Sequence, residues 1–363
     1  MRHSICRIRL LSKNLNLIIM ENWKRFFSSL MFGLMAVCAM TLSACGDDDD
    51  DDNGGGGSAS SVNNPLVSEG GKLLSSVSRY YGNSSYPSTY SIYYDGKLRP
   101  YRMCDDYDEL YVIDFDNGLM SIWEGDEGSW SVKFNSNGYI TKINGSWEYE
   151  YDGENNYCLM EWSASYDNDG HLKSVTSVYE EQEGDYYEKG TFNDALNWSN
   201  GNLVSVNGNG KWYDANGKET GHINNTMTFA YGSQLNKYKQ YPGIMNDPLT
   251  YCGLYGKGSN MLPVSMTEES KEVSGSESYE DNYNRTSTYT LNEDGSINTE
   301  IWKDESNDNT IKFVYDYSDA KSVANGITRS DISSTTMSTT DKAKLISNFM
   351  HNLPFFPKRR SGK

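Results

Sequence analysis

The sequence predicts an all-β protein: a large antiparallel meander of hairpins that forms an open or closed barrel-like sheet, followed by a short C-terminal helix. Two observations predict the sheet. Short runs rich in Tyr, Trp, Val, Ile and Thr alternate with Gly-containing turns between residues 71 and 318, and this texture is typical of strands. The chain also holds 28 Tyr and 8 Trp, so a substantial core can form although only 37% of its residues are hydrophobic.

The first element along the chain is an export signal in residues 1–44. Lys24 and Arg25 precede an apolar run from Leu30 to Met40, which is too short to span a membrane as a helix. The run leads into Leu42-Ser-Ala-Cys45, which resembles the lipobox of bacterial lipoproteins. We therefore expect cleavage before Cys45 and attachment of lipid to its thiol. Residues 1–19 carry no comparable pattern, so Met20 is the expected true start.

Residues 45–70 are predicted to be an acidic, Gly-rich disordered tether, because Asp47–Asp52 and Gly54–Gly57 offer nothing to bury. A tether at this position favours a lipoprotein over an ordinary signal peptide whose last cysteine is accidental. The acidic run resembles the signal that sends Bacteroidetes lipoproteins to the outer face of the outer membrane. The alternative is a solvated spacer. We expect a lipid-anchored protein of the outer membrane whose body faces the cell exterior.

The charge balance excludes one class of partner. The full chain carries a formal net charge of −18. Six of the 32 basic and one of the 50 acidic residues precede Cys45, which leaves 26 basic and 49 acidic residues and a net charge of −23 after processing. A negative field repels nucleic acid and anionic headgroups. We therefore expect no nucleic-acid partner and attribute membrane attachment to the lipid alone.

The body, residues 71–318, is predicted from a repeated turn motif: an aromatic, a few Asp, Asn or Ser residues, Gly, and then a strand residue. Phe134–Ile140, Tyr166–Leu172 and Trp198–Leu203 are examples. Asn-Gly and Asp-Gly between strand-like runs predict tight hairpins. Period-two alternation, as in His171–Val178, predicts one buried and one solvated face. The outward positions are charged or polar, which argues against a membrane-spanning barrel.

Three segments depart from this pattern. Residues 246–263 are irregular, and we expect residues 238–254 to contain a short helix or ordered loop that crosses one end of the sheet. Residues 268–284 are polar and acidic, which predicts a solvated hairpin arm. Residues 319–363 are predicted to comprise a Ser/Thr linker, a short helix that begins near Asp341 and an exposed basic tail.

The lipobox, the Asp-rich tether, the hairpin motif and the segment Gly253-Leu-Tyr-Gly-Lys-Gly-Ser-Asn-Met-Leu-Pro263 together resemble the DUF4595 family of secreted Bacteroidetes lipoproteins. The resemblance covers about residues 70–317. It implies a porin-like, meandering β-sheet with no assigned activity, and it adds no catalytic residue. Similar aromatic-Asp-x-x-Gly hairpins also occur in YD/Rhs repeat proteins.

The sequence contains no recognisable catalytic, cofactor or metal motif. His171, His222 and His351 are the histidines left after processing, and we interpret His171 and His222 as exposed turn or strand residues. Asp167-Asn-Asp-Gly170 resembles the start of a calcium loop, but it lacks the later oxygen ligands, so turn chemistry explains it better. Cys104, Cys158 and Cys252 can form at most one disulfide, and packed free thiols are expected.

Aromatic side chains are the remaining candidates for a binding role. Most of the tryptophans are expected in the core, but Trp147 and Trp162, on neighbouring strands, are the predicted platform for stacking on sugar rings. The sequence thus favours a non-catalytic binding or scaffold lipoprotein of the envelope, whose partner is a glycan or an envelope protein. The alternative is a hydrolase that acts on polysaccharide through paired carboxylates, which the abundant Asp and Glu leave open.

Overall fold

The computed structural model describes residues 72–319, apart from residues 83, 106–108, 122–129, 152–153, 184–185, 242–247 and 306–308. The export signal, Cys45, the tether and the C-terminal segment from residue 320 lie outside the described residues. The predictions for them, including the C-terminal helix, stay predictions. Within the described ranges, no helix is long and apolar enough to cross a bilayer.

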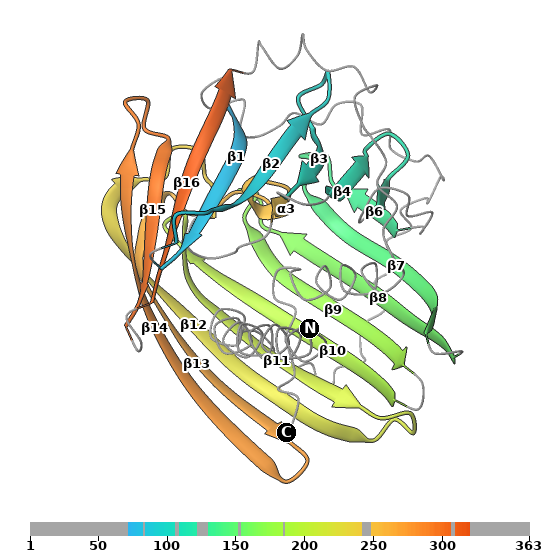
Figure 1. Cartoon of the computed structure of the whole chain (residues 1–363). Coiled ribbons are helices and arrows are strands. Elements are labelled where there is room, and N and C mark those ends of the chain that lie inside the picture. Colours follow the sequence, from blue (N-terminus) through green and yellow to red (C-terminus); the bar gives the residue numbers. More distant parts are fainter. Residues whose placement is uncertain are drawn as a thin grey trace, which may run out of the picture.

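Sixteen antiparallel strands form one closed barrel (Figure 1), so the predicted meander is confirmed and the sheet closes. Each strand pairs with its neighbours in the chain, and the first strand completes the circle by pairing with the last. In that pair, Lys72 lies opposite Asp319 and Tyr81 opposite Ile311. Closure therefore gives both flanks of every strand a hydrogen-bonding partner.

The strands differ in length around the barrel. The first six are β1 (Lys72–Tyr81), β2 (Ser88–Tyr94), β3 (Pro100–Cys104), β4 (Glu109–Asp114), β5 (Leu119–Ser121) and β6 (Trp130–Phe134). The others are β7 (Ile140–Tyr151), β8 (Glu154–Tyr166), β9 (Leu172–Glu183), β10 (Tyr186–Ser199), β11 (Asn202–Tyr213), β12 (Glu219–Leu235), β13 (Met261–Ser274), β14 (Glu277–Leu291), β15 (Ile297–Asp304) and β16 (Thr310–Asp319). Strands β7 to β14 have 12 to 17 residues, and in Figure 1 the long strands extend well beyond the short ones.

The period-two pattern separates an inner from an outer face of the wall. On β10, Phe192, Asp194 and Leu196 are buried, whereas Asn193 and Ala195 between them are more exposed. Successive strand residues point to opposite faces, so the buried set lines the interior. The largest side chains there, such as Trp130, Trp162, Trp212 and Phe313, are at most 1% exposed. The core of the protein is therefore the interior of the barrel.

Five hairpin turns share one hydrogen-bonding pattern, as the repeated motif predicts; they begin at Asp95, Asn135, Asp167, Asp214 and Asn292. In each turn the first residue donates its N–H to the carbonyl four residues later and accepts the N–H from three residues later. The fourth residue has a positive φ, between 74° and 89° where it is glycine. Leu98 takes this position in the first turn with a φ of 62°. Glycine is therefore favoured at this position because it tolerates positive φ without a Cβ clash.

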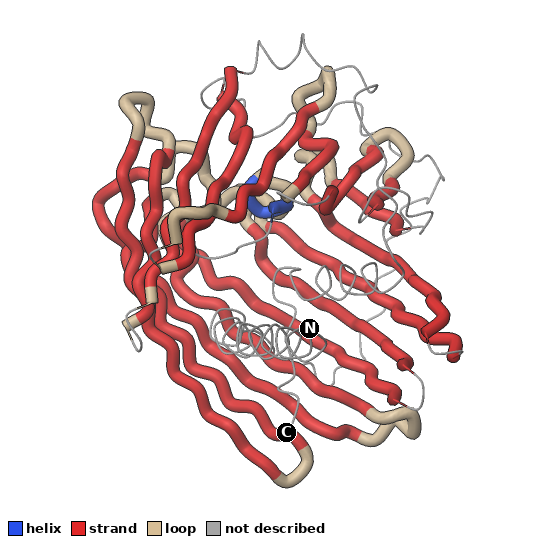
Figure 2. Tube along the Cα trace, in the orientation of Figure 1, coloured by secondary structure: helices blue, strands red, loops and turns tan. Residues whose placement is uncertain are grey.

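The connection between β12 and β13 bonds to hairpin turns at one end of the barrel, and we call its described residues, 236–241 and 248–260, the cap segment. It contains the helix α3 (Pro248–Tyr251), which is the helix coloured in Figure 2. The prediction of a short helix or ordered loop is thus confirmed. The cap segment bonds to successive hairpins at this end: Leu254 accepts the N–H of Ile140, and Lys257 donates its N–H to Gly170. Its side chains Leu249, Tyr251 and Tyr255 are buried in the core.

One prediction about the fold is wrong. Residues 268–284 do not form a solvated arm but belong to β13 and β14 within the wall. Glu268 and Glu272 point inward and are only 2% and 3% exposed. The polar composition suggested an arm because half of each strand does face water, and composition alone does not reveal the other half. The three cysteines of the body are described, and none of them forms a disulfide; Cys158 and Cys252 are buried.

Candidate functional site: the interior of the long strands

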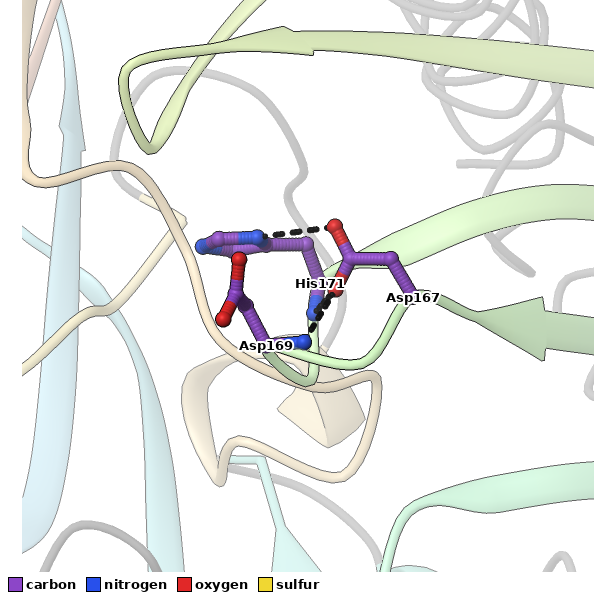
Figure 3. A group of neighbouring side chains, drawn as sticks. All are labelled: Asp167, Asp169 and His171. Atoms are coloured by element: carbon purple, nitrogen blue, oxygen red, sulfur yellow. Dashed lines mark hydrogen bonds and ion pairs between the residues drawn. The ribbon is translucent and has the colours of Figure 1, made fainter.

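Asp167, Asp169 and His171 form the group of potential metal ligands in the described part of the chain, with ligand atoms within 4.8 Å of one another (Figure 3). The Asp167 carboxylate accepts the backbone N–H groups of Asp169 (3.0 Å) and His171 (2.9 Å) and contacts Nδ1 of His171 at 3.1 Å. Burial favours a raised pKa for Asp167, but these hydrogen bonds outweigh burial and its pKa is lowered.

The hydrogen bonds of the hairpin turn determine the positions of Asp167, Asp169 and His171. Asn135 accepts the equivalent two N–H groups in its own turn, and so does Asp214. Because an uncharged Asn does the same work, the carboxylate of Asp167 is explained without an ion. The prediction that His171 is exposed is wrong: it is 7% exposed and stacks on Trp198 at 4.2 Å. His222 is 41% exposed and contacts Glu219 at the outer surface.

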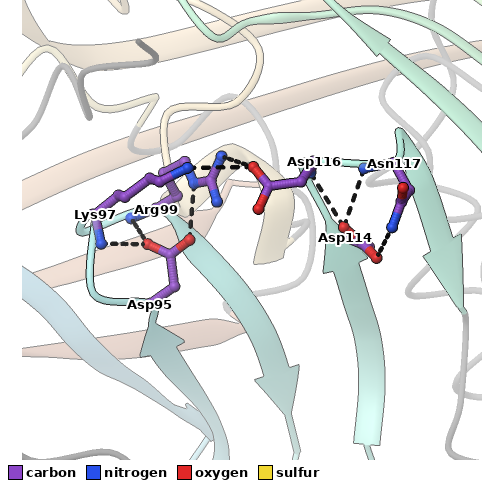
Figure 4. A network of polar contacts seen from close by, with 6 residues as sticks. All are labelled: Asp95, Lys97, Arg99, Asp114, Asp116 and Asn117. Atoms are coloured by element: carbon purple, nitrogen blue, oxygen red, sulfur yellow. Dashed lines mark hydrogen bonds and ion pairs between the residues drawn. The ribbon is translucent and has the colours of Figure 1, made fainter. Parts of the chain in front are cut away.

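A second polar network joins two hairpins on the short-strand side (Figure 4). Arg99, which is 4% exposed, binds Asp95 through Nε at 2.7 Å and Asp116 through Nη1 at 3.1 Å. Its guanidinium also lies over the Phe115 ring at 4.8 Å. Each charge in this network has a partner within the protein. We therefore interpret it as a clamp between the turns that follow β2 and β4.

The interior of the long strands has a different character, because buried polar groups there lack partners. Asp194 on β10 pairs with Gly208 on β11, which pairs with Asn225 on β12. All three residues are buried on the inner face. Glycine projects no side chain, so Asp194 and Asn225 face each other across two strand spacings, about 10 Å. Gly210, the next inward residue of β11, likewise projects no side chain.

The row of side chains around the gap offers hydrogen-bond acceptors. Asn225 donates its Nδ2 to Oε1 of Glu268 at 3.0 Å. Among the described residues, no partner reaches the other Glu268 oxygen, the Asn225 carbonyl oxygen or either Asp194 oxygen. Buried polar atoms are nearly always paired, so each exception calls for an explanation. We call Asp194, Gly208, Gly210, Asn225 and Glu268 the acceptor row.

Burial sets the protonation of the two carboxyl groups. It raises the pKa of Asp194 well above its usual range. It also raises the pKa of Glu268, although the Asn225 hydrogen bond and the Arg285 charge act in the opposite direction. Both shifts favour the neutral carboxylic acid, in which one oxygen becomes a donor. The acceptor row can therefore exchange hydrogen bonds with hydroxyl groups without holding two buried charges.

The structure separates the two tryptophans of the predicted platform. Trp162 lies opposite Ile143, and Trp147 opposite Cys158, four positions further along β7. Trp162 is 0% exposed and packs against Tyr255 of the cap segment at 5.2 Å. It is therefore a core residue and does not present an open stacking face. The side chain of Trp147, like Cys45, lies outside the part of the chain whose contacts are described.

The acceptor row was missed at the sequence level, although a signal was present. Asp194 stands in phase with Phe192 and Leu196, so period-two alternation places it among inward apolar residues. Gly208 and Gly210 likewise stand in phase with Val206 and Trp212. A carboxylate in the apolar phase beside two inward glycines predicts a polar gap in the core.

Comparisons with known proteins leave the chain without an assigned family. No protein-family model and no curated protein matches it, so the DUF4595 resemblance is not confirmed. The solved structures similar to it include two crystal structures described as porin-like proteins. One, from Bacteroides vulgatus ATCC 8482, is 12% identical with a TM-score of 0.44. The other, from Bacteroides uniformis ATCC 8492, is 13% identical with a TM-score of 0.26. Each match covers 68% of this chain and 98% of the other. At this similarity, function must be argued from the chain's own residues.

The pKa shifts predict a pH-dependent stability. A carboxyl group whose pKa is raised by folding stabilises the fold fully below its unfolded pKa, about 4, and this contribution is lost as the pH rises toward the folded pKa. Asp194→Asn removes one such group. We expect the free energy of unfolding of the variant, relative to that of the wild type, to increase as the pH rises above about 4, by up to about 1.4 kcal/mol per pH unit. Chemical denaturation between pH 4 and 8 measures the difference, and parallel curves would contradict the assignment.

Proposed function

We propose that this chain is a non-catalytic binding protein of the bacterial envelope, which holds a glycan segment against the acceptor row inside its barrel. The unpaired oxygens of Asp194, Asn225 and Glu268 carry the proposal. Sugar hydroxyl groups supply the donors that these oxygens lack. Gly208 and Gly210 leave the wall beside these oxygens without inward side chains.

The carboxyl groups of the row support binding over hydrolysis. A glycosidase uses one protonated and one ionised carboxyl group, whose environments push their pKa values apart. Burial raises the pKa of both Asp194 and Glu268, so the two environments push in the same direction. This pair does not provide the division of roles that the hydrolase alternative requires.

The outer face of the barrel supports attachment through a lipid on Cys45. Membrane-spanning barrels present an apolar band to the bilayer. Here polar residues predominate among the exposed positions of β12 and β13, for example Asn224, Thr226 and Thr228 on β12 and Glu269 and Lys271 on β13. Such a surface is compatible with water around the barrel. In this proposal the body faces the cell exterior and is held to the outer membrane by its acylated N-terminus.

A glycan array followed by incubation with each bound glycan tests the function. We expect retention of at least one glycan without release of products, because the row binds hydroxyl groups and lacks an ionised partner. Gly208→Val fills the gap and should reduce affinity at least about tenfold, the effect of one hydrogen bond to a charged or buried group. The matched control is Asn209→Val, on the same strand but facing outward, which should bind as the wild type does. Product release, or equal loss in both variants, would contradict the proposal.

Replacing Asp47–Asp52 by alanine tests the location. If the acidic run is a sorting signal, acylation at Cys45 remains intact while externally added protease reaches a smaller fraction of the protein on whole cells. Cys45→Ala is the control for anchoring, because no acyl chain can be attached and the protein should leave the membrane fraction. Unchanged protease access in the alanine variant would show that the run is a spacer.

A further inference from the structure

Three arginines of the described residues are at least 95% buried, and they differ in how their charge is balanced: Arg79, Arg99 and Arg285. Arg99 binds two aspartates, as described above. Arg285 lies opposite Asp304, and its charge lowers the pKa of Glu268 and Glu300 relative to the effect of burial. The Arg79 guanidinium instead contacts tyrosines.

The surroundings of Arg79 are aromatic and uncharged. It points inward from β1, donates from Nη2 to the Tyr90 hydroxyl at 3.1 Å, and has no partner at Nε among the described residues. The guanidinium lies 5.0 Å from the Tyr81 ring centre and 5.2 Å from that of Tyr90. Tyr251 of α3 also interacts electrostatically with the guanidinium. Ring faces and one neutral hydroxyl thus surround this buried charge, and none of the described carboxylates forms an ion pair with it.

The carboxylate of Glu300 lies on the same row of the barrel wall as Arg79 but does not neutralise its charge. Arg79 pairs with Phe313 of β16, and Phe313 pairs with Glu300 of β15. Glu300 thus lies two strands away, with the Phe313 ring between. Its oxygens accept hydrogen bonds from Trp302 (2.5 Å), Tyr315 (2.7 Å) and Tyr289 (3.0 Å). Glu300 therefore has its own partners.

From the Arg79 guanidinium and the Tyr90 hydroxyl, we infer that this corner of the barrel is a binding site for a single oxyanion, a carboxylate, sulfate or phosphate group. The free Nε–H supplies one donor of the guanidinium fork, which matches the geometry of such groups. The Tyr90 oxygen already accepts from Nη2, so its own hydrogen is available as a further donor. The Tyr81 and Tyr90 rings flank the site.

The charge of the whole protein limits the ligand. At a net charge of −18 the chain repels a polyanion over long range. A ligand with a single acidic group carries little charge, so electrostatic repulsion opposes its entry less. The site lies on β1 and β2, apart from the acceptor row on β10 to β13, so it does not depend on the proposed glycan function. If both hold, an acidic sugar is a ligand that each could bind.

Isothermal titration of the full mature chain in detergent tests the site, with sulfate, phosphate and acetate as probes and chloride at equal ionic strength as the reference. We expect saturable binding of at least one oxyanion; binding of acetate alone indicates a carboxylate ligand, and binding of sulfate or phosphate alone indicates an ester. Arg79→Met should weaken it about 10- to 100-fold, the effect of losing a charged hydrogen-bonding partner. The matched control Arg99→Met removes a buried arginine that already has its aspartates and should leave oxyanion affinity unchanged.

Tyr90→Phe keeps the ring and removes the hydroxyl, so it decides the question even if Arg79→Met fails to fold. It should weaken oxyanion binding at least about threefold, the effect of one modest hydrogen bond. Wild-type titrations that are identical to chloride would overturn the inference. Full affinity in Arg79→Met, or in Tyr90→Phe, would overturn it as well.

Discussion

The pairing of β1 with β16 is the contact on which the rest of the structure depends. A meander of sixteen strands without it would end in two long rows of unpaired N–H and C=O groups. Once the two strands pair, every strand has two neighbours and the wall separates an interior from the outside. The positions of all inward side chains follow, because a one-residue slip in register would exchange the two faces of a strand. Core packing, the cap segment and both candidate sites are consequences of this closure.

Closure also buries the inward polar groups, and a buried polar group with too few partners indicates a ligand site. At the surface, Asp194 or Arg79 would be solvated and would require no explanation. Inside the wall, each loses water and gains too little in return. The interior contains counterexamples that show what full pairing looks like, namely Glu300 with three donors and Arg99 with two aspartates. Against these neighbours, Asp194 and Arg79 mark places suited to a ligand.

The strands and turns could be predicted from the sequence because their causes are local. Alternation over a few residues and a glycine at the fourth turn position are sufficient to place a hairpin. Closure could not be predicted, since it depends on pairing between residues 240 positions apart, such as Ser76 and Asp316. His171 and Trp162 were misjudged for the same reason: Trp198 and Tyr255, which cover them, come from distant segments. Asp194 could have been found from its phase among apolar residues, but the absence of a partner could be seen only in the folded chain.

Hydrogen–deuterium exchange of the full mature chain, followed by mass spectrometry, tests the closed barrel most directly. Backbone amides that are bonded on both flanks exchange slowly, whereas those on an open edge exchange fast. The account predicts that peptides from β1 (72–81) and β16 (310–319) are protected to the same degree as those from β12 and β13 in the middle of the meander. Fast exchange of β1 and β16 together, with protected β12 and β13, would show an open sheet and would contradict the enclosed interior on which both sites rest.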